Sequence, residues 1–112
     1  MKDTKVIMPP VDVYEASDGY MLVLDMPGAL KDTIEITTEG DTLTVKADTV
    51  PVADGWKPLV TEFETGQYRR VFTIGQRVDR EKIRAKYESG VLTIEMEKSE
   101  QVRPRKIEVK AA

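Results

Sequence analysis

Cysteine, histidine and asparagine are all absent from the 112 residues of this sequence. Without cysteine, neither a disulfide framework nor a thiolate metal site can form. Without histidine, the chain lacks the usual general base, the usual zinc ligand and every Ser-His or Cys-His nucleophile. Without asparagine there is no N-glycosylation site. These absences count against an enzyme or a metal-binding domain, so we expect no catalytic residues, no metal and no cofactor.

Long apolar runs are also missing. The longest, YMLVL at residues 20–24, is far shorter than the roughly 20 residues that a membrane-spanning helix requires. The N-terminal stretch MKDTKVIMPP has three apolar residues in a row before its prolines, too few for the core of a signal peptide. We therefore expect a soluble, cytoplasmic protein with no membrane partner.

The net charge is small, at −3, and it is distributed unevenly. Residues 99–112 carry four basic and two acidic side chains, a net charge of +2, and the other 13 basic and 18 acidic side chains give −5. An acidic body with a slightly basic tail argues against nucleic acid as a partner. It weakly favours a tail that meets another copy of the body, because salt screens such charges. The alternative is a tail whose basic residues serve solubility alone.

Apolar and polar residues alternate along most of the chain. Between residues 20 and 26, for example, Tyr20, Leu22, Leu24 and Met26 would share one face of a strand. The same period of two recurs in five further stretches, at residues 33–37, 42–47, 68–74, 83–88 and 92–97. This pattern is typical of antiparallel strands that bury one face.

Turn sequences separate these stretches, at residues 18–19, 27–32, 39–41 and 89–90. The last of them, Ser-Gly, leaves a two-residue hairpin loop. Only DREK at 79–82 suggests a helical turn. Several short strands with regular turn signals predict a single all-β domain folded as an antiparallel β-sandwich.

About twenty residues separate the strand that ends at Ala47 from the strand that begins at Tyr68. Loops this long in compact domains are usually functional or contain structure of their own. Leu59 and Phe63 would lie on one side of a strand within this segment, and Trp56 comes just before it. We interpret the segment as an arm that holds a strand out for another chain, since an unpaired edge invites a partner. The alternative is that the arm folds back onto its own sheet.

No motif for catalysis stands out. The carboxylates mostly alternate with apolar residues, which favours a solvated face over a catalytic pair, and Ser89 lacks the flanking glycine of a nucleophile elbow. Arg70 shares a face with Tyr68 and Phe72, where an unpaired charge would be expensive to bury. We predict that Arg70 has a carboxylate or backbone carbonyl partner at or near a subunit interface. The alternatives are an arginine that lies flat on the surface, with its stem covered, or one that stacks on bases.

Four stretches, in their order along the chain, resemble one protein family. DMPGALKDTIEITTEGDTLTVKA at 25–47 is similar to a P-G turn followed by two strands, and YRRVFTIG at 68–75 to an R-x-F-x-L-P segment. AKYESGVLTIEMEK at 85–98 looks like an A-x-x-x-N-G-V-L signature with the last domain strand, and KIEV at 106–109 looks like an I-x-I/V tail motif. Together they resemble the α-crystallin domain of small heat-shock proteins, the Hsp20 type of bacteria and plants. Ser89 stands where this family usually has Asn or Asp, and Gly75 where it usually has proline.

The resemblance implies an immunoglobulin-like β-sandwich at residues 11–98, between a short N-terminal arm at 1–10 and a C-terminal tail at 99–112. The N-terminal arm is shorter than the family usually has. The resemblance also implies that an exchange strand within 54–64 pairs with an early strand, about 11–15, of a second subunit. The residues expected at this dimer interface are Val11, Val13, Trp56, Leu59, Phe63 and Arg70.

The tail motif also acquires a predicted use. Ile107 and Val109 would project to the same side of an extended strand, about 7 Å apart. In the family, such a pair docks into a groove between two edge strands of a neighbouring subunit, which correspond here to about 33–38 and 83–88. The groove residues expected are Ile34, Ile36, Ile83 and Ala85. The alternatives are a tail that folds into the groove of its own subunit or hangs free.

For function, the resemblance implies an ATP-independent holdase chaperone, which binds partly unfolded proteins and suppresses their aggregation. It would assemble as a homodimer and possibly as a higher oligomer. An alternative with the same fold is a co-chaperone or scaffold module, like the p23/CS relatives, that binds a folded partner. The G-V-L hairpin and the tail motif favour the chaperone.

Overall fold

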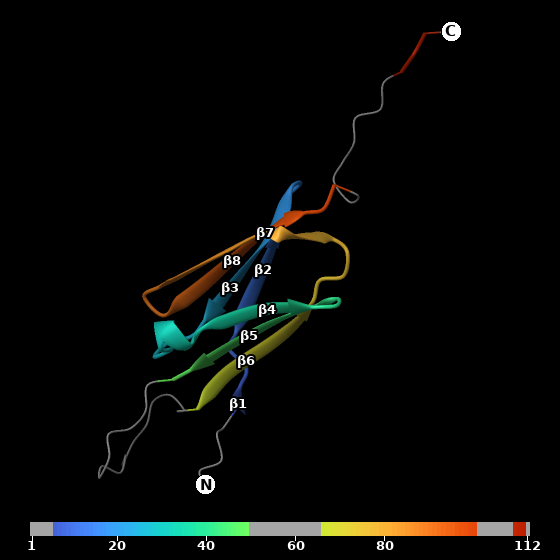
Figure 1. The fold of residues 1–112 in the computed structure, drawn as a ribbon. Helices are drawn as coiled ribbons and strands as arrows, with labels where there is room; N and C mark the ends of the chain where they lie inside the picture. The colour runs from blue at the N-terminus through green and yellow to red at the C-terminus, as the bar shows by residue number, and fades with distance from the viewer. Residues whose placement is uncertain (1–5, 50–65, 101–108, 112) are drawn as a thin grey trace, which may run out of the picture.

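The computed structural model describes residues 6–49, 66–100 and 109–111. The strands are β1 Val6–Ile7, β2 Val11–Glu15, β3 Gly19–Asp25, β4 Glu35–Glu39, β5 Thr42–Asp48, β6 Gln67–Thr73, β7 Val78–Glu88 and β8 Val91–Lys98, and a 3₁₀ helix, η1, spans Lys31–Thr33. They form two four-stranded sheets, ordered β1-β6-β5-β4 and β2-β3-β8-β7, that pack face to face (Figure 1). All neighbouring strands are antiparallel except β1 and β6. The predicted all-β sandwich is therefore confirmed.

The hydrophobic core lies between the sheets and follows the predicted alternation. In β8, Leu92, Ile94 and Met96 are buried, whereas Thr93 and Glu95 between them are not. The other strands add core residues with the same period: Leu22, Leu24, Leu43, Val45, Ala47 and Tyr68. Burying one such aliphatic side chain contributes about 1.5–3 kcal/mol. A slip of one residue in strand register would turn the whole set outward, so this alternation fixes the register.

Two tyrosines, one from each sheet, fix the turn that follows β3. The Tyr68 hydroxyl in β6 donates to the carbonyl oxygen of Pro27 at 2.9 Å, and the Tyr87 hydroxyl in β7 donates to that of Met26 at 2.8 Å. Burial raises the pKa of Tyr68, with a further contribution from nearby Tyr87. The Met26 amide in turn donates to the carbonyl of Gly90 at 2.7 Å. The turn is thus anchored to both sheets at one end of the sandwich.

The predicted hairpin between β7 and β8 is present, with a local strain. Ser89 and Gly90 have φ angles of 52° and 80°, so both residues adopt the left-handed conformation of a type I′ turn. Gly90 adopts it freely, and a Cβ added there would lie 3.4 Å from the Cα of Pro27. Ser89 has no such freedom, because a serine side chain tolerates this region less well than asparagine does.

The prediction of a helical turn at 79–82 is wrong, because these residues belong to β7. Val78 pairs with Lys98, and regular pairing with β8 resumes at Ile83 after a register shift. Val78 and Ile83 both pack on the core although five positions separate them. This spacing breaks the period of two that marks a strand, so the local pattern misled the prediction.

The predicted N-terminal arm contributes to the first sheet. Val6 and Ile7 form β1, which runs parallel to β6 opposite Gln67 and Tyr68. Ile7 packs against the core, and Pro9 is fully buried. A two-residue strand is too short to produce a recognisable alternation.

Candidate functional site

The sandwich exposes two pairs of sheet edges, one on each side. β4 and β7 end their respective sheets on one side, and β2 ends the second sheet on the other. β1 pairs with β6 at Gln67 and Tyr68 alone, so the rest of β6 has no strand on that side within the described ranges. Unpaired edges offer rows of backbone donors and acceptors to another chain. Each side also carries a groove.

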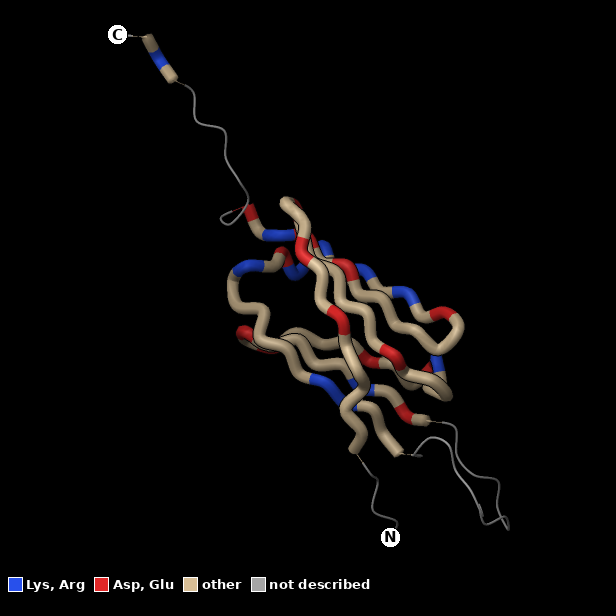
Figure 2. Tube along the Cα trace, turned by 180° about the vertical axis from the view of Figure 1, so that it is seen from behind, with Lys and Arg blue, Asp and Glu red and all other residues tan. Residues whose placement is uncertain are grey.

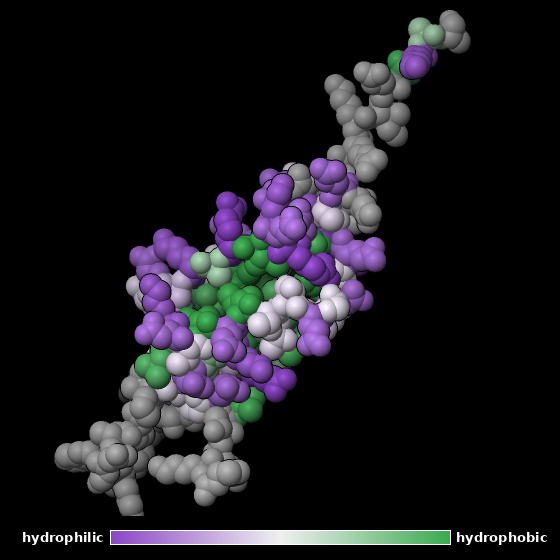
Figure 3. Space-filling model, in the orientation of Figure 1, coloured by the Kyte–Doolittle hydropathy of each residue, from purple (hydrophilic) through white to green (hydrophobic). Residues whose placement is uncertain are grey.

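The β4/β7 groove lies between the edge strands predicted to receive the tail, and it encloses about 280 Å³. Its lining consists of Ile36, Thr38, Leu43, Arg80, Ile83 and Ala85. The structure thus brings three of the four predicted groove residues together. The fourth, Ile34, packs against the core beside the groove and is not part of its lining. Figure 3 shows apolar side chains between hydrophilic rims on the face of the molecule that carries β4 in Figure 1.

Arg80 is a groove residue that our reading of the sequence missed. Its guanidinium donates to three backbone carbonyls, those of Gly40 and Gly75 at 2.7 Å each and that of Val78 at 3.1 Å. The mistaken helical turn at 79–82 concealed that Arg80 lies on a strand edge. Val78, two residues earlier, was the available signal, because a β-branched residue favours a strand over a turn.

The β2/β6 groove lies on the opposite side of the sandwich and encloses about 260 Å³. Its lining consists of Val13, Tyr20, Leu22, Phe72, Thr73, Ile74, Arg77, Val78 and Met96. Val13, predicted at the dimer interface, opens into this groove and is 60% exposed. Val11, predicted beside it, is half-buried against the core. An exposed valine on an unpaired edge strand is a suitable contact for another chain.

Arg70 lies on β6 near this side. One guanidinium nitrogen approaches the carbonyl oxygen of Pro9 at 3.5 Å, and the guanidinium carbon lies 5.8 Å from the centre of the Phe72 ring. The prediction was a carboxylate or a backbone carbonyl partner, and the structure places a backbone carbonyl of the same chain beside Arg70. The location of Arg70 at a subunit interface stays a prediction.

An ion pair that the sequence did not predict secures the edge strand β2. The ammonium group of Lys98, whose side chain is only 10% exposed, lies 2.7 Å from a carboxylate oxygen of Glu15. The same ammonium lies 5.2 Å from the centre of the Tyr20 ring. The hydrogen bond from Lys98, together with its positive charge, lowers the pKa of Glu15. The end of β8 thereby holds the end of β2 across β3.

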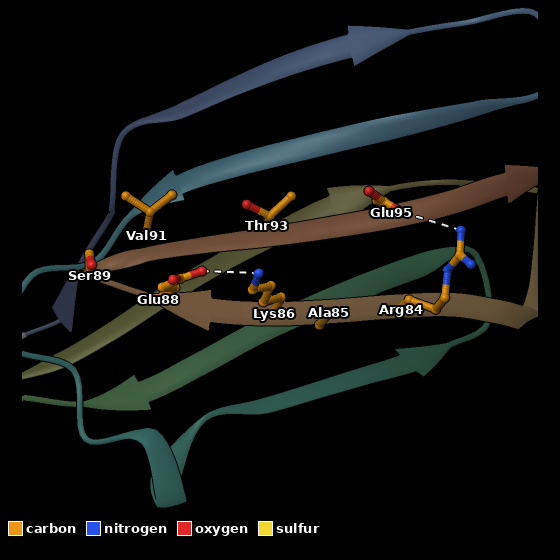
Figure 4. A pocket seen from close by; sticks show the side chains of 8 residues that line it. All are labelled: Arg84, Ala85, Lys86, Glu88, Ser89, Val91, Thr93 and Glu95. Carbon is orange, nitrogen blue, oxygen red and sulfur yellow. Dashed lines mark hydrogen bonds and ion pairs between the residues drawn. The ribbon is translucent and has the colours of Figure 1, made fainter.

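Charged residues of both signs intersperse along the strands of the second sheet (Figure 2), and a hollow lies on its outer face. In the close-up of Figure 4, Arg84 reaches Glu95 at 3.2 Å and Lys86 reaches Glu88 at 3.0 Å, around a hollow of about 550 Å³. All four side chains are more than half exposed. Exposed pairs of this kind contribute roughly 0–1 kcal/mol. This face matches the solvated face that the sequence predicts.

The remaining predicted site residues belong to the arm and to the C-terminal tail. Trp56, Leu59, Phe63 and Ile107 fall outside the described residues, as does the segment 54–64. Val109 is described and is 94% exposed. Within the three described ranges, no group of acidic side chains is arranged to hold a metal ion. In the same part of the chain, the structure contains no helix with the length and apolar character needed to cross a membrane.

Comparisons with known proteins agree with this architecture. Residues 12–110 match the Hsp20/alpha crystallin family. The chain is 32% identical over 109 residues to the 18 kDa antigen 1 of Mycobacterium avium, covering 97% of this chain and 74% of that protein. It is 30% identical over 107 residues to a probable 15 kDa heat shock protein of Leptospira interrogans, covering 96% and 82%. A solved small heat-shock protein from Xylella fastidiosa aligns with a TM-score of 0.76 and 26% identity, over 94% of this chain and 98% of that one.

Proposed function

Because the chain belongs to the Hsp20/alpha crystallin family, whose members are chaperones, we propose that it acts as an ATP-independent holdase. It binds apolar segments of partly unfolded proteins and slows their aggregation. Affinity for unfolded chains is enough to alter their fate, so no nucleotide is required. The observation that carries the proposal is the pair of grooves, each with apolar residues in its lining and each beside a strand that ends its sheet among the described residues. An extended apolar segment can add to such an edge through backbone hydrogen bonds and place alternate side chains in the groove.

In this proposal, two subunits associate through the β2/β6 edge. The arm strand within residues 54–64 of one subunit pairs with β2 of the other, and its apolar side chains cover Val13 and the β2/β6 groove. The proposal is supported by the position of β2 at the end of its sheet among the described residues and by the exposure of Val13. Covering one half-exposed valine contributes of the order of 1 kcal/mol, so the strand hydrogen bonds and several such contacts act together.

Tail docking belongs to the β4/β7 groove. Ile107 and Val109 of a neighbouring subunit enter it, where Ile36, Ile83 and Ala85 provide apolar contacts. Burial of each tail side chain is worth about 1.5–3 kcal/mol, from which the ordering of the tail must be subtracted. A single docked tail is therefore weak and reversible, whereas several within one closed assembly hold firmly through effective concentration. Because Lys98 ends β8 and Ser99 is hydrogen-bonded to Gln76, the linker available to the tail motif is 100–105, which can span at most about 22 Å.

An aggregation assay tests the proposed function. A heat-labile client is warmed without ATP, with and without the full chain at equal and at fourfold excess, and light scattering is followed. We expect dose-dependent suppression of scattering and a soluble complex of client and chain on gel filtration. No suppression at any excess would contradict the holdase. Binding to a folded client, with no effect on scattering, would favour the p23/CS-like alternative.

A further inference from the structure

Arg80 alone is charged among the six described residues that line the β4/β7 groove. One of its terminal nitrogens, Nη2, donates to the carbonyl oxygens of both Gly40 and Gly75 at 2.7 Å. The other, Nη1, donates to the carbonyl of Val78 at 3.1 Å. The structure shows no carboxylate partner for Arg80 within the ranges it describes, so the charge is stabilised by these three carbonyl dipoles.

These hydrogen bonds connect the two walls of the groove. Gly40 lies in the turn between β4 and β5, so it belongs to the first sheet, whereas Arg80 belongs to β7 in the second. Gly75 lies in the loop that leads from β6 to β7. A single side chain therefore spans the groove at the end where β4 finishes and β7 starts.

The loop that supplies Gly75 is itself held on two sides. The amides of Gly75 and Ile74 both donate to the carbonyl of Asp41, at 3.1 and 2.8 Å respectively. On the other side, the Ser99 amide and hydroxyl donate to the carbonyls of Arg77 and Gln76, both at 2.8 Å. Because these hydrogen bonds hold its acceptors in place, the Arg80 guanidinium links fixed points of the two sheets. We refer to this link as the strut.

The chemistry of the side chain suits this task. A guanidinium is planar and presents its donors as a rigid fork, so it can reach two diverging carbonyls at once. Hydrogen bonds from a charged donor are shorter and stronger than neutral ones. A lysine keeps the charge on a flexible stem as a single point, and a glutamine has one amide donor group without charge.

We propose that Arg80 is a positioning residue for the β4/β7 groove: its hydrogen bonds fix the two walls at the separation that accepts the tail motif. The proposal rests on the tail docking described above. A groove whose width is fixed in advance binds a segment more tightly, because less ordering is needed on binding. Without the strut, the turn at Gly40 moves relative to β7, and the groove retains its apolar lining but not its width.

A peptide titration tests the proposal. The full chain with Ile107→Gly and Val109→Gly leaves the groove free of its own tail, and a fluorescent peptide RKIEVK is the ligand. Arg80→Gln in this background is the test variant, and Arg80→Lys is the conservative one. Arg84→Gln, an exposed arginine on the same strand, controls for charge. Tyr68→Phe, which loses the hydrogen bond to Pro27 outside the groove, controls for general destabilisation.

We expect Arg80→Gln to weaken peptide binding about tenfold and Arg80→Lys to weaken it less, with both controls within about twofold of the background. All measurements are made at temperatures well below the unfolding midpoint of each variant. A variant that is merely less stable then remains folded, and its affinity for the peptide stays unchanged. Should Arg80→Gln fail to fold, Arg80→Lys decides by the same comparison.

Equal affinity in the Arg80 variants and the background would overturn the strut while leaving tail docking intact. A loss of affinity no larger than that of Tyr68→Phe would overturn it too. If the peptide does not bind the background variant at all, tail docking is wrong and the strut falls with it. The client aggregation assay would still test the holdase separately.

Discussion

The two open edges of the sandwich carry grooves of similar size that differ in what lies beneath them. The β2/β6 groove is backed by four buried core residues, Leu22, Ile74, Val78 and Met96, so a segment that enters it extends the core. The β4/β7 groove is backed by one buried core residue, Leu43, and is spanned at one end by Arg80. The first arrangement suits lasting association between subunits, and the second suits a small, reversible contact with two side chains.

The largest expected effect follows from removing the partner of the β2/β6 edge. Deleting residues 54–64 should weaken dimerisation at least about a hundredfold, because the exchange strand and its apolar side chains are lost together. Sedimentation of the full chain and the deletion variant over a range of concentrations measures this. The same concentration dependence in both would show that the arm does not exchange.

Arg70→Ala sharpens the assignment of this edge. The change removes a guanidinium that contacts Pro9 and covers Phe72, beside the proposed interface. We expect dimerisation about tenfold weaker, with peptide binding at the β4/β7 groove unchanged. Dimer affinity and melting temperature equal to those of the unmodified chain would count decisively against an interface role for Arg70.

Acid should loosen the β2 edge before the β4/β7 edge. Lys98 lowers the pKa of Glu15, so the pair stabilises the fold above the usual glutamate pKa, about 4.3, and this contribution is lost as the pH falls through the lower folded-state value. Glu15→Gln should therefore be slightly less stable than the unmodified chain at pH 7, and this difference should shrink as the pH falls through the lowered pKa of Glu15. Urea unfolding over a series of decreasing pH values provides the measurement. A difference that persists unchanged into acid would place its origin elsewhere.

The smallest effect is expected at Ser89, which lines neither the β4/β7 groove nor the β2/β6 groove. Ser89→Asn places a residue that tolerates φ near 52° in the β7–β8 turn, so stability should rise by about 0.5 kcal/mol. Dimer mass and peptide affinity should stay the same. Thermal unfolding checks the first expectation, and a fall in midpoint would refute the strain at Ser89.

The sequence predicted the parts of the fold that repeat a simple period. β3, β5 and β8 each bury one face, so their apolar residues recur at every second position, and the hairpin at Ser89–Gly90 carried its own turn signal. The start of β7 was mispredicted because a register shift interrupts that period. β1 was missed because a strand of two residues is too short to display a period of two.

The candidate site was predictable to the extent that it is apolar. Ile36, Ile83 and Ala85 could be placed in one groove from the strand pattern together with the family resemblance. The polar groups that stabilise each edge, Arg80 and Lys98, could not be predicted, because their partners are distant in sequence. Arg80 bonds a carbonyl 40 positions away, and Lys98 pairs with a carboxylate 83 positions away. Such contacts depend on the tertiary fold and leave no local pattern.

The mass of two variants in solution tests most directly whether the two edges have separate roles. One variant carries Ile107→Gly and Val109→Gly in the tail, and the other carries Val13→Asp on β2, with folding checked by circular dichroism. The account predicts a dimer for the tail variant, whatever the mass of the unmodified chain, and a monomer for Val13→Asp, because a carboxylate there would have to be buried unpaired. A dimeric Val13→Asp variant or a monomeric tail variant would contradict it.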